Sequence, residues 1–138
     1  MMKRSNIIAL ILFLVYLAAV AYCCFGHFSD LPQVESSYFG IPSDKIVHFL
    51  MFFPFPILFF LAFDRHTTKP WQAVLMTAIT FALGCALAAA TEIGQSFTTY
   101  RSGDPLDFYA DILSLGISSL LILTVDIWKM KRDRAKGE

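Results

Sequence analysis

Four long apolar segments, separated by short polar connections, constrain the fold of this chain more than any other feature. They cover about residues 7–25, 46–63, 71–95 and 106–128. The hydrocarbon core of a bilayer is about 30 Å thick and is crossed by a helix of about 20 apolar residues. Each segment is therefore predicted to span a membrane as a helix. The predicted fold class is all-α, a four-helix transmembrane bundle.

The composition favours a membrane protein over a soluble one. Hydrophobic residues make up 57% of the chain and charged residues only 16%, whereas soluble domains carry about 25% charged residues. The length fits a single domain over residues 1–138. We expect membrane lipids as partners and no nucleic acid.

The basic residues indicate how the chain is oriented. Lysine and arginine mark the cytoplasmic side of a membrane protein, and with four spans both termini and the middle connection share one side. Nine of the eleven basic residues are on that side. They are Lys3, Arg4, Arg65, Lys69, Lys129, Lys131, Arg132, Arg134 and Lys136. The N and C termini, including the basic tail at 129–138, are therefore predicted to be cytoplasmic.

The first apolar segment has a second interpretation. Lys3-Arg4, the apolar run and the small residues at 19–21 together resemble a signal peptide with a cleavage site. Cleavage would leave three spans in the same orientation. We favour an uncleaved first span, because the apolar run continues past that site to Phe25.

Acidic residues gather on the side opposite the termini, and several of them lie within the predicted helices. In the fourth segment, polar residues follow a 3-4-3-4 spacing, which places them on one helix face. They are Asp104, Asp107, Asp111, Ser114 and Ser118. An unpaired carboxylate in a membrane costs on the order of 2.5–3.5 kcal/mol. This face is therefore predicted to contact other helices and not lipid.

Ionisable residues also stand at the same side of the second and third segments, so we expect all of them to converge in one outward-opening polar pocket. The candidate ligand-binding residues are Asp44, Lys45, His48, Glu92, Gln95, Arg101, Asp107 and Asp111. Arg101 precedes the fourth segment on a loop, where its guanidinium could pair with a carboxylate or a ligand phosphate.

Two features of the pocket leave alternatives open. His48 could ligate a metal together with the acids, or it could pair with one of them. We favour pairing, and we expect no metal and no cofactor. Pro54 and Pro56 could hinge the second helix or only kink it, and we favour a static kink.

Three short motifs occur in a fixed order relative to the spans. They are Asp-Lys-x-x-His-Phe at 44–49, Glu-x-x-Gln at 92–95, and Arg101 followed six residues later by Asp107. In this combination, over about residues 44–116, the chain resembles the VanZ-like family of bacterial membrane proteins. It departs from the family pattern at Asp111, where the family usually has asparagine, and at Ser114, where a glycine is expected.

The resemblance implies a cell-envelope protein of the bacterial inner membrane, linked to resistance to the glycopeptide antibiotic teicoplanin. We rank three function classes. The first is binding of a cell-envelope ligand, such as a lipid-linked wall precursor or a glycopeptide. The second is an enzyme acting on a lipid-linked or phosphate-containing envelope substrate, and whether any reaction is catalysed stays open. The third is proton- or cation-coupled transport, ranked last because no polar path is expected in the cytoplasmic half.

Overall fold

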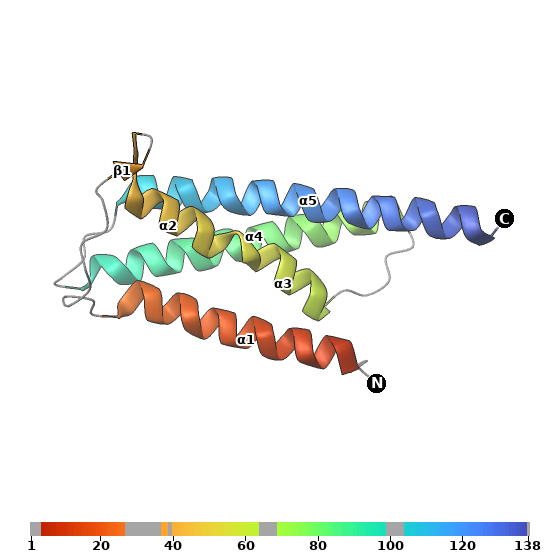
Figure 1. Cartoon of the computed structure of the whole chain (residues 1–138), viewed down its shortest axis with the longest axis horizontal. Coiled ribbons are helices and arrows are strands. Elements are labelled where there is room, and N and C mark those ends of the chain that lie inside the picture. The colour runs from red at the N-terminus through yellow and green to blue at the C-terminus, as the bar shows by residue number, and fades with distance from the viewer. Residues whose placement is uncertain (1–3, 27–36, 39, 64–68, 99–103, 138) are drawn as a thin grey trace.

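Helices form almost the whole of the structure, a computed structural model (Figure 1). It describes residues 4–26, 37–38, 40–63, 69–98 and 104–137. The helices are α1 (Arg4–Phe25), α2 (Ser43–Phe52), α3 (Pro54–Phe63), α4 (Pro70–Ser96) and α5 (Pro105–Gly137). Together α2 and α3 form one span, so four segments are long and apolar enough to cross a membrane. The predicted all-α, four-span bundle is confirmed.

The spans run side by side, and the two ends of the bundle differ in character. Both chain termini lie at one end, which we call the terminal end (Figure 1). The starts of α2 and α5 and the end of α4 lie at the other, which we call the polar end (Figure 1). Which end faces the cytoplasm rests on the distribution of basic residues alone and stays a prediction.

The second span is broken in the middle, as its two prolines predict. Helix α2 ends at Phe52, and α3 begins at Pro54. Proline has no backbone N–H, so carbonyls one turn earlier lose their helical partner. Hydroxyls of neighbouring helices bond to carbonyls adjacent to the freed ones, and so tie the broken segment to α1 and α5. Tyr16 Oη lies 2.8 Å from the Met51 carbonyl oxygen, and Ser114 Oγ lies 2.5 Å from that of Phe49.

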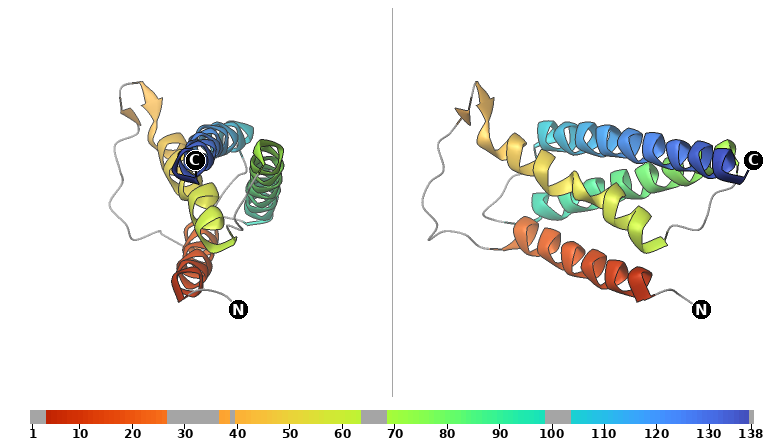
Figure 2. Two further views of the ribbon diagram at one scale, coloured as in Figure 1. Left: turned by 90° about the vertical axis from the view of Figure 1, so that its right-hand side faces the viewer. Right: turned by 45° about the vertical axis from the view of Figure 1, so that its right-hand side comes forward.

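Helix α1 packs mainly on α3, at one edge of the bundle (Figure 2). The Phe13 ring meets Phe55, Phe59 and Phe63 edge-on, with ring centroids 5.6, 5.8 and 6.0 Å apart. Such edge-to-face pairs add to the stability gained by burying the rings. The outward-facing side chains of the bundle are large and apolar, as lipid contact requires.

Helices α4 and α5 run antiparallel and pack against each other (Figure 1). They approach closely at Gly84. A Cβ atom at Gly84 would lie 2.6 Å from Leu115 Cδ2, so a larger residue there would force the leucine side chain to shift. This contact places Gly84 and Leu115 at the same level of the bundle. Each helix rises 1.5 Å per residue, so residues equally far from the contact, counted in opposite directions along the two helices, are also level. The residue pairs Glu92–Asp107, Thr80–Ser119 and Ala73–Asp126 therefore lie at matching levels.

A short hairpin, which was not predicted, precedes α2. Its strands are β1 (Ser37–Tyr38) and β2 (Ile41–Pro42), which pair antiparallel. Gly40 has φ +79°, a left-handed conformation that glycine adopts without steric cost. The hairpin leads directly into the first turn of α2, which contains the first polar residues of the candidate site.

Candidate functional site

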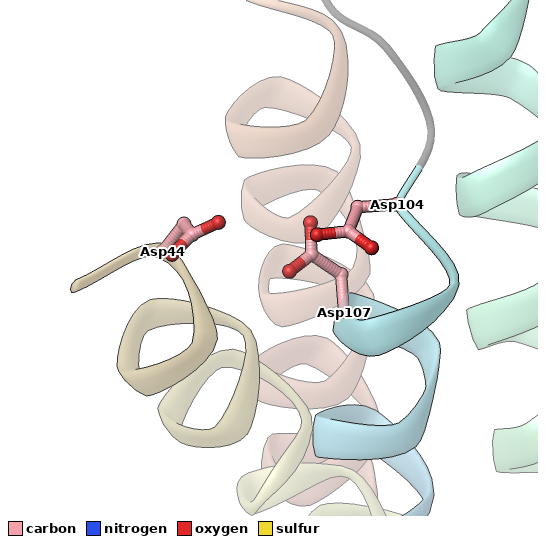
Figure 3. A group of neighbouring side chains, drawn as sticks. All are labelled: Asp44, Asp104 and Asp107. Carbon is pink, nitrogen blue, oxygen red and sulfur yellow. The ribbon is translucent and has the colours of Figure 1, made fainter. Parts of the chain in front are cut away.

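At the polar end, the ammonium group of Lys45 forms ion pairs with three carboxylates. From the first turn of α2 it reaches across to the start of α5, where Nζ lies 2.5 Å from an oxygen of Asp104 and 2.5 Å from one of Asp107. It also lies 3.0 Å from Asp44 on its own helix. Figure 3 shows the three carboxylates converging from the two helices. Lys45 thus joins α2 to α5.

Asp104 caps α5 as well as pairing with Lys45. Its Oδ1 accepts a hydrogen bond from the Leu106 backbone N–H at 2.9 Å, which satisfies one of the unpaired donors at the helix start. The hydrogen bond from Lys45, together with that from Leu106, holds the pKa of the Asp104 carboxyl below its usual range. Asp104 therefore stays ionised and keeps Lys45 charged.

One turn further into the bundle, His48 lies between two carboxylates of α5. Its Nε2 is 3.6 Å from Asp107 Oδ2, and its Nδ1 is 3.2 Å from Asp111 Oδ1. His48 is 1% exposed and Asp111 is fully buried. We call the connected series Lys45–Asp107–His48–Asp111 the charge chain. The pairing of His48 with an acid, favoured from the sequence, is present in the structure.

The polar face of α5 continues beyond the charge chain. Ser114 and Ser118 are fully buried, and Ser118 Oγ donates to the Ser114 carbonyl oxygen at 2.8 Å. Because Asp107 and Asp111 are buried as well, the part of the 3-4-3-4 face that lies within the span contacts the other helices and not lipid, while Asp104 at the helix start is partly exposed. That prediction is confirmed.

Glu92 differs from the residues of the charge chain because no side chain pairs with its carboxylate. Both of its carboxylate oxygens are buried, no described side chain donates a hydrogen bond to them, and the Asp104 backbone N–H is near enough to stabilise the charge. Glu92 interacts electrostatically with Asp107 and His48. Glu92 lines an open groove between α4 and α5, of about 650 Å³ including the space open to solvent. The groove's other walls are Ala89, Ile93, Ser96, Pro105 and Phe108.

Two of the eight predicted site residues are not joined to this network by the described contacts. Gln95 is buried, and its Nε2 donates to the Cys24 carbonyl oxygen at 3.2 Å, which ties α4 to the end of α1. Arg101 lies outside the described residues. Lys45 with its three acids and His48 with Asp111 are brought together, and Glu92 lies beside them.

Three acids of the site have the composition of a cation site. Oxygens of Asp44, Asp104 and Asp107 lie within 4.8 Å of one another. Their common neighbour, however, is the Lys45 ammonium. A divalent cation would have to displace this lysine, because the ammonium already occupies the point where the three carboxylates meet.

Sequence reasoning missed a second group of buried polar residues near the terminal end. Asp126 is 7% exposed and Ser119 is 4% exposed, and both line a cavity between α3, α4 and α5. The expectation that no polar path reaches the cytoplasmic half stays a prediction. The signal was present in the 3-4 spacing of residues 119, 122 and 126, which extends a buried face of α5.

The fold and the site define a multi-pass membrane protein with a network of charged side chains buried at one end of a four-span bundle. The VanZ/LLP1 family matches residues 13–126. The match includes the charge chain and most of all four spans, and the chain belongs to this family. No solved structure matches the chain.

A curated relative is similar along most of the chain. It is described as uncharacterized protein C11E3.10 of Schizosaccharomyces pombe, and it is 29% identical over 118 residues. The match covers 86% of this chain and 63% of the relative's length. Because this relative comes from a eukaryote, the bacterial inner membrane stays a prediction.

Proposed function

We propose that the polar end binds a cell-envelope ligand, namely a lipid-linked wall precursor or a glycopeptide such as teicoplanin. The observation that carries the proposal is the carboxylate of Glu92, which is buried beside an open groove and receives no hydrogen bond from any described side chain. An unsatisfied buried carboxylate costs several kcal/mol. A ligand that donates hydrogen bonds to Glu92 recovers this cost on binding.

The charges of the site specify which part of the ligand is recognised. The described groups comprise five carboxylates, on Asp44, Glu92, Asp104, Asp107 and Asp111, against one lysine and one histidine. Lys45 is engaged by three of those carboxylates. Hydroxyl and amine groups, which sugar and peptide parts supply, therefore suit the groove better than phosphate does.

The groove's apolar walls fit a ligand that is held in the membrane. Ala89, Ile93 and Phe108 flank Glu92 on the surface of α4 and α5. A lipid or acyl tail can lie along such walls while the polar part reaches the carboxylate. We assign the ligand contact to Glu92 and Arg101, and the shaping of the site to the charge chain.

Proton- or cation-coupled transport is the second candidate. The observation in its favour is the series of buried polar residues along α5, from the charge chain through Ser114 and Ser118 to Ser119 and Asp126. Catalysis is less favoured, because His48 is too buried to contact a substrate. Proton flux into liposomes that carry the protein, abolished in Asp111→Asn, would support transport. Absence of such flux would remove this candidate.

Binding is tested with the purified protein in lipid nanodiscs, using teicoplanin and a lipid-linked wall precursor as probes. We expect Glu92→Gln and Arg101→Ala each to weaken binding about tenfold or more, since hydrogen bonds to charged groups contribute about 1.5–3 kcal/mol. Asp133→Asn removes an acid at the terminal end and should leave binding unchanged. If neither probe binds, or if Glu92→Gln binds both as the wild type does, the proposal is wrong.

A further inference from the structure

Helix α5 extends past the neighbouring helices at the terminal end (Figure 1). It continues to Gly137, whereas α4 begins at Pro70. Counted from the close contact between α4 and α5, Pro70 lies at the level of Lys129. The remaining eight residues of α5, about 12 Å of helix, therefore stand beyond the start of α4.

The two tryptophans of the chain lie at one level of this end. Trp71 is 13 residues before Gly84 on α4, and Trp128 is 13 residues after Leu115 on α5. Because Gly84 and Leu115 are level, the two tryptophans are level as well. Both side chains are 60% exposed. Tryptophan concentrates at the boundary between hydrocarbon and headgroups, so the headgroup layer is expected to begin here.

The outward-facing stripe of α5 changes from apolar to cationic at this boundary. Leu121, Val125 and Trp128 follow helical spacing and are exposed, so they face lipid. The next positions of the same stripe are Lys131 and Arg132, which are exposed as well. Lipid-facing apolar side chains are therefore followed directly by two cations.

Both cations keep hydrogen-bond donors for a ligand. The guanidinium carbon of Arg132 lies 5.0 Å from the centre of the Trp128 ring. Its Nε is 3.7 Å from Asp133 Oδ1, which is too long for a hydrogen bond. Lys131 forms no ion pair with any residue that the structure describes. An anion above Trp128 can therefore be reached by an ammonium and by a planar guanidinium together.

The described residues of the terminal end carry a net positive charge. Two acids, the buried Asp126 and the exposed Asp133, stand against six basic residues. The six are Lys69, Lys129, Lys131, Arg132, Arg134 and Lys136. The polar end has the opposite character, because five carboxylates there stand against one lysine and one histidine. An anionic headgroup is therefore attracted to the terminal end and repelled from the polar end.

We propose that Lys131 and Arg132 bind the headgroup phosphate of an anionic phospholipid, whose acyl chains lie along the exposed stripe of α5. The site is independent of the one at the polar end. Lys131 and Arg132 stand about 4.5 and 6 Å beyond Trp128 along the helix axis. The headgroup layer is about 5–7 Å thick on each side of a bilayer, so both cations lie within it. The guanidinium fork matches the spacing of phosphate oxygens.

The experiment follows the fluorescence of Trp71 and Trp128 with the protein in phosphatidylcholine liposomes. Bromine atoms on an acyl chain quench a tryptophan that they touch, so brominated lipids report which lipid lies at this level. Brominated phosphatidylglycerol is compared with brominated phosphatidylcholine at equal mole fractions. A cation at an anionic membrane surface strengthens binding about fivefold. We expect the wild type to prefer phosphatidylglycerol about fivefold or more, and Lys131→Gln with Arg132→Gln to prefer it less than about twofold.

Two double variants serve as controls. Arg134→Gln with Lys136→Gln removes the same charge about 9 and 12 Å beyond Trp128, outside the headgroup layer, and should keep most of the preference. Lys131→Arg with Arg132→Lys keeps both charges and should keep the preference as well. Equal quenching of the wild type by the two lipids would overturn the proposal and would point to a soluble acidic partner instead. An equal loss of preference in the two glutamine variants would also overturn it, since the charge would then act without a site.

Discussion

Replacing Lys45 with methionine tests how much the network at the polar end contributes to stability. The substitution keeps the length of the side chain and removes the ammonium that three carboxylates share. The side chains of Lys45 and Asp107 are 14% and 12% exposed, whereas those of Asp104 and Asp44 are 40% and 49% exposed. Most of the cost therefore arises at Asp107.

The magnitude follows from that difference in burial. Removing one partner of a buried ion pair costs about 3–5 kcal/mol, whereas an exposed pair contributes about 0–1 kcal/mol. Because Lys45 keeps some exposure, we expect Lys45→Met to lower the free energy of unfolding by about 3 kcal/mol. Asp44→Asn, which breaks only the most exposed pair, should cost less than about 1 kcal/mol.

A double variant distinguishes an unpaired charge from lost packing. In Lys45→Met with Asp107→Leu, the buried pair becomes apolar, and such replacements are often neutral. We expect the double variant to be more stable than Lys45→Met alone, at a total cost of about 1–2 kcal/mol. Unfolding by SDS in mixed micelles, followed by circular dichroism, measures these values. A cost below about 1 kcal/mol for Lys45→Met, or a double variant less stable than that single variant, would refute the reasoning.

The other predictions concern pH and the attachment of α1. The pKa of Asp104 is lower in the folded protein than in the unfolded chain, so its contribution to stability is present above the unfolded-state pKa and is lost as pH falls through the folded-state pKa. The free energy of unfolding of Asp104→Asn should accordingly depend less on pH in that window than that of the wild type. An identical pH dependence in the two proteins would contradict this. Gln95→Leu removes the donor to the Cys24 carbonyl, costs about 1 kcal/mol, and should speed maleimide labelling of buried Cys24 without changing that of exposed Cys23. Equal labelling rates of Cys24 in the two proteins would count against this contact.

The spans and the buried face of α5 could be predicted because the bilayer imposes simple rules. Length and hydropathy identify a span, and the cost of a lone charge in lipid forces Asp107 and Asp111 toward other helices. The meeting of Lys45 and His48 with those acids follows from the same cost, since only protein partners can neutralise a buried carboxylate.

Features that depend on helix rotation and register could not be predicted from the sequence. Gln95 shares a helix face with Glu92, yet its amide bonds to α1, because α1 ends beside that turn of α4. Asp126 lies in the fourth predicted span, and the alignment of α4 with α5 at Gly84 and Leu115 places it beside a cavity. Neither the position of α1 nor that register is visible in spacing alone.

The most direct test of the account labels a cysteine at Ser96, an exposed residue on the rim of the Glu92 groove. The variant lacks the three native cysteines and is expressed in intact cells, to which a membrane-impermeant maleimide is added. A second variant carries its cysteine at Lys131, at the terminal end. The account predicts that position 96 is labelled in intact cells and is protected by teicoplanin or a lipid-linked wall precursor, while position 131 is labelled only after permeabilisation. Labelling of position 96 only after permeabilisation, or without protection by either ligand, would contradict it.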